Sequence, residues 1–206
     1  MAAGCWTVPR EVAGPTDATV DLSRKALLLF SIRLDHDLMP EPPPVPHGVF
    51  IDREYFPIRR PAREPFGPFT HESLVRLAIE PGRHTMRSII GQGCGDYGGW
   101  GIGSFDIPIA SDFEVAAGSA VYLGRIEAHT RERRDCEFTA GHDVWLNGQG
   151  FCRWLDTTWE IGIRDAYDAD MRQFRAFFPA VRPLAVEKRV LAFDRSRAQA
   201  SWEAKR

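Results

Sequence analysis

LVRLAIEPGRHTMRSII, from Leu74 to Ile90, contains the pattern that decides the fold class. Over 74–79, Leu74, Arg76 and Ala78 alternate with a second set of large apolar residues, and a period of two is typical of a half-buried β-strand. The apolar positions are Val75, Leu77 and Ile79. Pro81 then presets one turn position and Gly82 permits a positive φ at the next. The stretch predicts a strand, a tight turn and a second strand over 84–90.

The same arrangement recurs further along the chain. Asp112 to Thr130 again predicts strand, turn and strand, with Ala117-Gly118 as the turn. KALLLFSIRL, from Lys25 to Leu34, and Trp159 to Arg164 are further strand candidates. We expect six residues of these strands in the core: Phe30, Ile32, Leu77, Ile79, Val121 and Leu123.

One segment has helical rather than strand periodicity. From Asp165 to Phe178 the apolar side chains recur on one helical face, and Asp165 can cap the first turn. These apolar residues are Tyr167, Met171, Phe174 and Phe178. The predicted fold is therefore mainly β: an antiparallel β-sandwich of about seven strands with one C-terminal amphipathic helix near 165–178.

The composition excludes several classes of protein. With 206 residues, 26 Lys+Arg and 28 Asp+Glu, the formal charge is −2, which gives no overall attraction to nucleic acid. A content of 44% hydrophobic and 26% charged residues is typical of a globular domain, and 18 Gly with 15 Pro favour many turns. The longest purely apolar stretch, Ala26–Phe30, is far shorter than the ~20 residues that cross a bilayer. We expect no cofactor.

Patterning divides the chain into three parts. Residues 1–24 are polar with little periodic apolar sequence, so we expect a disordered arm or tether. Residues 25–181 hold the predicted strands and helix and form the domain. Residues 182–206 are polar and predict a C-terminal tail.

FEVAAGSAVYLGRI, from Phe113 to Ile126, is preceded by EPGRH at 80–84. This combination resembles a motif, F-x-V-x-x-G-x-x-x-Y-L-G-x-I, of bacterial envelope proteins without an assigned activity. Those proteins carry a carboxypeptidase-regulatory-like β-sandwich, and many look like lipoproteins. The resemblance covers roughly residues 26–130. It implies a fold and a location in the cell envelope rather than a reaction.

The N-terminus bears on this location. Ala2-Ala3-Gly4-Cys5 is similar to the end of a lipoprotein signal, in which Cys5 receives the lipid. This hypothesis requires the natural product to begin upstream of Met1, because residues 1–14 contain neither a basic nor an apolar signal region. The alternative is a cytoplasmic protein.

Candidate chemical groups are few. The glycine-rich segment 91–103 contains no lysine and so does not match a phosphate-binding P-loop. Cys94, with His84 or His129 as base, is the candidate nucleophile of a small hydrolase. Its alternative is a small residue among glycines. Tyr97 and Trp100 are candidate ligand contacts at a loop tip, or aromatic residues that pack within the turn.

The four cysteines do not have zinc-site spacing. Cys136 and Cys152 are either a disulfide across a hairpin or two separate thiols. Aspartates at 35 and 37, and at 165, 168 and 170, resemble metal ligands, but a solvated loop and a helix N-terminus explain them better, so we predict no metal site. The leading hypothesis is a non-catalytic binding or structural module whose partner is a protein or glycan of the envelope. Its oligomeric state stays open.

Overall fold

The computed structural model describes residues 16–36, 44–58, 71–93, 103–141 and 155–205, and every structural statement below concerns these ranges. Within them the chain is mainly β, with nine strands in two sheets. Two α-helices, α2 (Tyr167–Phe177) and α3 (Arg195–Glu203), and a short 3-10 helix, Pro179–Val181, follow the long strands. The mainly β class and the amphipathic helix near 165–178 are thus confirmed.

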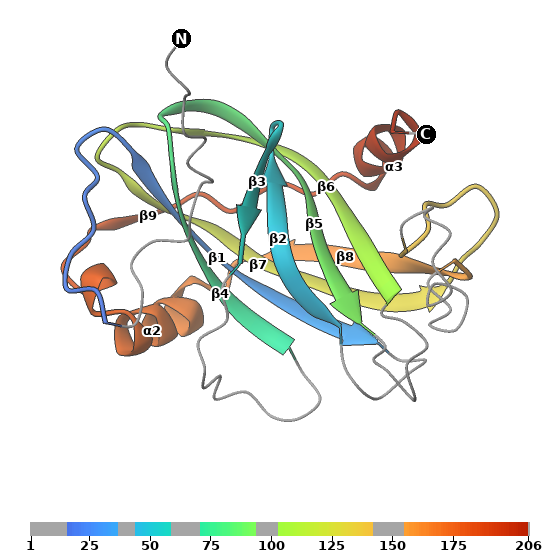
Figure 1. Cartoon of the computed structure of the whole chain (residues 1–206), viewed down its shortest axis with the longest axis horizontal. Coiled ribbons are helices and arrows are strands. Elements are labelled where there is room, and N and C mark those ends of the chain that lie inside the picture. Colours follow the sequence, from blue (N-terminus) through green and yellow to red (C-terminus); the bar gives the residue numbers. More distant parts are fainter. Residues whose placement is uncertain (1–15, 37–43, 59–70, 94–102, 142–154, 206) are drawn as a thin grey trace, which may run out of the picture.

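Sheet A has the strand order β4-β1-β7-β8, and β9 pairs with the start of β7. Its strands are β1 (Ala26–His36), β4 (His71–Ile79), β7 (Ala120–Glu132), β8 (Thr157–Arg164) and β9 (Val186–Lys188). Sheet B has the order β3-β2-β5-β6. Its strands are β2 (Val45–Ile51), β3 (Glu54–Pro57), β5 (Gly82–Gly93) and β6 (Gly103–Val115). Figure 1 shows the strands of sheet B crossing those of sheet A at a steep angle.

The two predicted tight turns carry the chain from one sheet to the other. β4 and β5 flank the turn at Pro81, yet they belong to sheets A and B respectively. β6 and β7 flank Gly118 and change sheet in the opposite direction. Gly118 has φ +77 and Gly82 has φ +140, which explains the glycines at these two turns. The strand, turn and strand predictions hold, but the flanking strands do not pair with each other.

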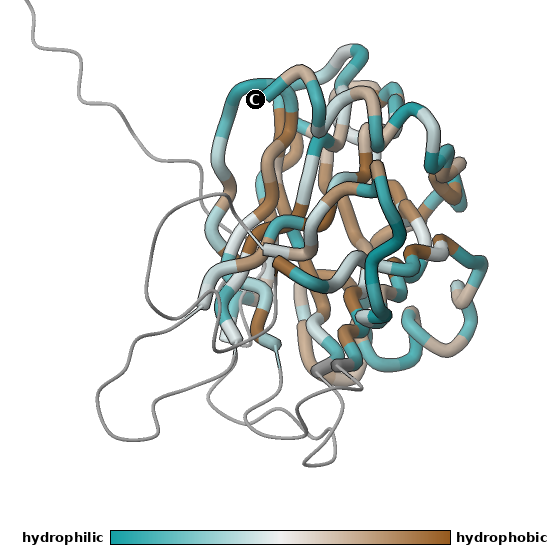
Figure 2. The backbone as a smooth tube through the Cα atoms, turned by 90° about the vertical axis from the view of Figure 1, so that its right-hand side faces the viewer, coloured by the Kyte–Doolittle hydropathy of each residue, from teal (hydrophilic) through white to brown (hydrophobic). Residues whose placement is uncertain are grey.

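The main hydrophobic core lies between the sheets. It combines side chains of sheet A, such as Phe30 and Leu77, with side chains of sheet B, such as Ile89 and Ile107. The six residues predicted as core are at most 3% exposed, so this prediction is confirmed. Figure 2 shows hydrophobic stretches along the strands inside the molecule and hydrophilic ones at the outer turns. The alternation in the sequence therefore reported the correct strand faces.

A second, smaller core lies on the other face of sheet A, beneath α2. Leu27 and Leu29 of β1 pack there against Met171 and Phe174 of α2. β1 is thus buried on both faces, which explains why Ala26–Phe30 is continuously apolar. Val20 and Leu22 also pack against this second core. Residues 20–22 therefore contact the domain, and the expected tether is wrong at this end.

Three further expectations differ from the structure. The described residues form nine strands rather than about seven, and α3 is a second helix. The pairings β1–β7 and β7–β9 are parallel, so the sheets are not wholly antiparallel. The segment expected as a polar tail contains β9 and α3. Periodicity identifies strands but does not report their partners, and five strands from both sheets, β2 to β6, separate β1 from β7 in the chain.

Candidate functional site

The predicted site residues fall into two sets. Five of them lie outside the described residues, and their roles stay predictions: Cys5, Cys94, Tyr97, Trp100 and Cys152. The two histidines are described but lie in different sheets, His84 on β5 of sheet B and His129 on β7 of sheet A. His129 is exposed.

His84 is fixed between two hydrogen-bond acceptors. Its Nδ1 lies 2.7 Å from Asp52 Oδ2, and its Nε2 lies 2.9 Å from the carbonyl oxygen of Glu80. A ring nitrogen that donates to an acceptor cannot at the same time take a proton from a thiol. His84 therefore joins two turns. Its role as a base for Cys94 stays a prediction, because Cys94 lies outside the described residues.

Cys136 is an exposed free cysteine in a turn after β7. Its φ of +67 is unusual for a residue with a side chain. Cys136 is thus a free thiol in this structure. Cys152 lies outside the described residues, so the choice between a disulfide and two separate thiols stays a prediction.

A surface pocket of about 540 Å³ lies beside α3, against sheet B. It is lined by the β2–β3 hairpin tip, β5, β6 and α3, and we call it the cationic pocket. Its lining residues are Asp52, Arg53, Thr85, Arg87, Ala110, Arg197, Ala200 and Ser201. The volume falls within the range of small-molecule sites. Three arginines against one aspartate give the pocket a cationic lining.

The hairpin tip is a two-residue turn, Asp52-Arg53, because Ile51 and Glu54 still pair. Asp52 has φ +53, a conformation that aspartate tolerates better than most residues. Its carboxylate accepts 2.8 Å from the Thr85 backbone N–H and contacts His84, which fastens the tip to β5. Arg53 is therefore held at the rim of the pocket.

Arg87 lies at an irregularity in both of its ladders. Between β2 and β5 the register shifts so that Arg87 has no opposite residue, and between β5 and β6 it shifts at the same position. On β6 the irregularity includes Ala110, whose φ is +50. β-Bulges redirect side chains, and strained backbone is concentrated at functional sites. Two of the three non-glycine residues with positive φ among the described ones line this pocket, Asp52 and Ala110.

The third wall is α3. Asp194 caps this helix by accepting from the backbone N–H groups of Ser196 and Arg197. Arg197 also donates to Asp112 at 2.7 Å, and the Thr85 hydroxyl donates to the same Asp112 oxygen at 2.6 Å. The hydrogen bonds from Arg197, and then from Thr85, lower the pKa of Asp112. The carboxylate thereby joins α3 to the sheet.

The remaining two arginines of the pocket are not neutralised. In the described part of the chain, Arg53 and Arg87 form no ion pair, and Arg87 donates at 3.4 Å to the Asp52 carbonyl oxygen. Asp52 directs its carboxylate to His84 and Thr85 instead. Guanidinium groups with open donors suit carboxylate and phosphate oxygens. The pocket is thus able to hold an anionic group.

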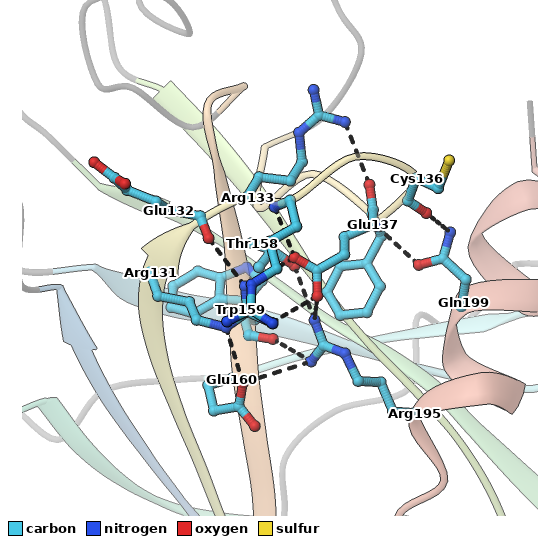
Figure 3. A network of polar contacts seen from close by, with 12 residues as sticks. Arg131, Glu132, Arg133, Cys136, Glu137, Thr158, Trp159, Glu160, Arg195 and Gln199 are labelled. Carbon is cyan, nitrogen blue, oxygen red and sulfur yellow. Dashed lines mark hydrogen bonds and ion pairs between the residues drawn. The ribbon is translucent and has the colours of Figure 1, made fainter.

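A network of ion pairs fixes the start of α3 to sheet A; Figure 3 shows it from close by. Arg131 of β7 donates to both carboxylate oxygens of Glu137, at 2.8 and 2.6 Å, and to Glu160 at 3.0 Å. Arg195 of α3 donates to Glu137 at 3.0 Å and to the Trp159 carbonyl oxygen at 2.9 Å. Chiefly the hydrogen bond from Arg131 lowers the pKa of Glu137 to about 2. We call these residues the anchor network.

Gln199 extends this attachment by one turn of α3. Its amide accepts from the Phe138 backbone N–H and donates to the Cys136 carbonyl oxygen, both at 2.8 Å. In Figure 3 this amide faces the 136–138 turn directly. Because Arg197 and Ser201 lie on the same helix, the anchor network and Gln199 position the third wall of the cationic pocket.

The contact of α2 with sheet A has a different character. Asp170 is fully buried and pairs with Arg125 of β7. It also accepts from Ser31 at 2.5 Å and from Tyr122 at 2.6 Å, which satisfies the tyrosine hydroxyl at the edge of a core. Burial and this hydrogen bond raise the pKa of Tyr122. We call this group the α2 network; its buried groups bind one another.

The described ranges contain no group of three or more His, Cys, Asp and Glu side chains placed to hold a metal ion. Asp165 and Asp170 do not form a pair of metal ligands. Asp165 binds Lys188 at 2.6 Å, whereas Asp170 points into the sheet. None of the helices there has the length and apolar character needed to cross a membrane.

Fold and site together define a mainly β protein with a cationic surface pocket. No protein-family model, curated protein or solved structure matches this chain. The residues of the site therefore carry the functional argument by themselves.

Proposed function

We propose that the protein is a non-catalytic binding module of the bacterial cell envelope, in which the two sheets form a β-sandwich and the cationic pocket holds an anionic partner. One observation carries the proposal: Arg53 and Arg87 line one pocket and, within the described residues, have no carboxylate partner. The partner is the acidic part of an envelope glycan or protein.

The backbone supports this assignment. Holding a non-glycine residue at positive φ costs about 1–3 kcal/mol, and the pocket holds two such residues, Asp52 and Ala110. The register shift at Arg87 also removes regular ladder bonds. The two-residue hairpin turn accounts for the φ of Asp52. Ala110 and the register shift at Arg87 redirect side chains at the pocket, and a binding site uses such features.

A binding role fits the pocket better than hydrolysis. The hydroxyl of Thr85 donates to Asp112, but Arg197 also binds this carboxylate and lowers its pKa, which makes Asp112 a weak base. Both nitrogens of the neighbouring His84 face other acceptors. A hydroxyl nucleophile needs a base that can take its proton. The lining residues offer positive charge and hydrogen-bond donors, which hold a ligand without reacting with it.

The envelope location rests on the sequence. The motif over 113–126 resembles bacterial envelope proteins, and Ala2-Ala3-Gly4-Cys5 is similar to a lipidation site. A lipid on Cys5 would hold the module at a membrane surface. Expression in a bacterium with its native upstream sequence tests this: the full-length product should partition to membranes, and a Cys5→Ser variant should not. Equal partitioning of both products would contradict the lipid anchor.

Binding to acidic and neutral oligosaccharides tests the pocket. We expect calorimetry at low salt to show binding of oligogalacturonate and no binding of a malto-oligosaccharide of the same length. The double variant Arg53→Gln/Arg87→Gln should weaken binding at least about tenfold, since each charge-assisted hydrogen bond contributes roughly 1.5–3 kcal/mol.

The matched control is Arg172→Gln, which removes an exposed arginine from α2 on the other sheet. It should leave the affinity unchanged. An equal loss in the control would mean that net charge rather than the pocket causes binding. Equal affinity for the charged and neutral oligosaccharides would contradict the proposed function.

A further inference from the structure

We propose that the preferred ligand of the cationic pocket is a doubly charged phosphomonoester group, clamped between sheet B and α3. This inference rests on the proposed function and specifies the chemistry of the ligand. It follows from three features of the pocket: the number of arginines without a carboxylate partner, the different elements that carry the arginines, and the hydroxyl-bearing and small residues of the lining, Ser201, Ala110 and Ala200.

Two of the three arginines that line the pocket have no carboxylate partner among the described residues. Arg197 pairs with Asp112 at 2.7 Å, and Asp52 pairs with His84 at 2.7 Å. Arg53 and Arg87 remain without a carboxylate partner among the described residues. A ligand with two negative charges neutralises both, whereas a single carboxylate leaves one guanidinium uncompensated. Phosphomonoesters carry about −1.5 to −2 charges at neutral pH.

The three arginines of the pocket belong to separate elements. Arg53 is on the hairpin tip, Arg87 on β5 and Arg197 on α3, so they line the pocket from different parts of the fold. A planar carboxylate is matched by one guanidinium in a two-pronged contact, while a tetrahedral group offers three oxygens to three donors. Ser201 adds a hydroxyl from α3 to the same lining.

Two small residues complete the wall. Ala110 and Ala200 line the pocket beside the arginines and leave room for the group that carries the phosphate. A cavity of about 540 Å³ exceeds the needs of a phosphate alone and accommodates an attached sugar. The source of the group is therefore either a phosphorylated glycan or free phosphate, and the shared chemistry is a phosphate dianion.

The ligand would also bridge two parts of the fold. Arg197 and Ser201 lie on α3, whereas Arg53 and Arg87 belong to sheet B. α3 buries Ala198 and packs the partly buried Trp202 against the main core. Polar contacts, which include Lys205 to Asp106 at 2.8 Å, add to its attachment. A bound dianion adds a contact between α3 and the sheet and lowers hydrogen exchange in 195–205.

The test compares small phosphates of different charge at pH 8 and low salt. Inorganic phosphate and methyl phosphate carry two charges there, dimethyl phosphate and acetate carry one. Calorimetry should show that methyl phosphate binds at least about tenfold more tightly than dimethyl phosphate and acetate. Glucose 6-phosphate distinguishes the sources: tighter binding than methyl phosphate points to a phosphorylated glycan, and equal binding to the phosphate alone.

Variants separate the pocket from general charge. Arg53→Gln and Arg87→Gln should each weaken methyl phosphate at least about tenfold, and Arg172→Gln on α2 should leave its affinity unchanged. In the wild type, saturating methyl phosphate should slow hydrogen exchange in 195–205 and leave 167–177 unchanged. Equal affinity for methyl phosphate and dimethyl phosphate overturns the inference, and so does unchanged exchange in α3.

The two proposals fail separately. If oligogalacturonate binds in an Arg53- and Arg87-dependent manner while methyl phosphate shows no preference over acetate, the proposed function stands and the phosphate inference is wrong. If no anion binds better than its neutral counterpart, both are wrong.

Discussion

Helix α2 packs against sheet A, whereas α3 contacts both sheets, and the charged residues beside the two helices have different surroundings. Beneath α2, Asp170 is fully buried and bound by Arg125, Ser31 and Tyr122. Beside α3, the pocket arginines Arg53 and Arg87 lie at the surface, and no described carboxylate neutralises them. Figure 1 shows the two helices at opposite ends of the molecule.

The difference follows from the cost of desolvating charge. A buried ion needs a partner, because an unpaired one costs several kcal/mol. A charge at an open pocket is solvated by water and can stay unpaired until a ligand replaces that water. The α2 network is therefore explained by stability, whereas the cationic pocket gains nothing for stability from its free arginines. This contrast supports a structural role for the α2 network and the proposed binding role of the cationic pocket.

The largest expected effect lies in the α2 network. Asp170→Asn leaves the buried Arg125 beside a neutral amide, with Glu72 at 2.8 Å as its remaining carboxylate partner. Breaking a buried pair completely costs about 3–5 kcal/mol, so we expect a loss at the lower end of this range. Urea unfolding of the purified variant should show this loss. Asp168→Asn, on the exposed side of α2, should change the free energy of unfolding by less than about 0.5 kcal/mol. A loss below about 1 kcal/mol at Asp170 would show that the network is not a stabilising one.

The anchor network should have an intermediate effect. Glu137 is partly buried, with 19% of its side chain exposed, and it binds both Arg131 and Arg195. Glu137→Gln removes the charge, so we expect a loss of roughly 2 kcal/mol at pH 7 after allowing for solvent screening. Unfolding experiments on Glu132→Gln, at an exposed position nearby, provide the control.

The free energy of unfolding of wild type, compared with that of Glu137→Gln, should depend on pH. The pKa of Glu137 falls from its ordinary 4.5 to about 2 on folding, so its contribution is complete above 4.5 and is lost as pH falls through about 2. The stability difference between wild type and Glu137→Gln should therefore shrink between pH 4.5 and 2. A difference that stays constant over this range would contradict the role of the Arg131–Glu137 pair.

The smallest expected effect lies in the cationic pocket. Arg87→Gln removes a charge that has no described carboxylate partner, so the free energy of unfolding should change by less than about 0.5 kcal/mol. Thermal unfolding without added anions checks this. A large loss would mean that Arg87 stabilises the fold, and the contrast between the two helices would weaken.

Sequence periodicity was sufficient for the interior of the fold. The alternation around Leu77 and Leu123 placed both side chains in the core, and the helical spacing of Met171 and Phe174 placed α2. Gly124 has φ +107, and a Cβ there would lie 3.2 Å from the Arg164 carbonyl oxygen, so this glycine permits a close approach of backbone. Local patterns report burial, because burial is decided by neighbouring residues in a strand or helix.

Local sequence patterns could not predict the cationic pocket. Arg53, Arg87 and Arg197 come from a turn, a strand and a segment that was expected to be a tail, and only the topology brings them together. One local signal existed: Asp52-Arg53 is a polar pair between two apolar runs, which is typical of a hairpin turn. The bulge at Arg87 has no sequence signature, since Ala110 stands where glycine would be expected for its φ of +50.

Amide chemical shifts test the central claim most directly, because one titration reports on both helices. In ¹⁵N-labelled protein titrated with oligogalacturonate, we predict saturable shift changes at Arg53, Arg87 and 197–201, with none over 167–177. Shift changes centred on α2, or none at the cationic pocket while binding is measured, would contradict the assignment of binding to the α3 side.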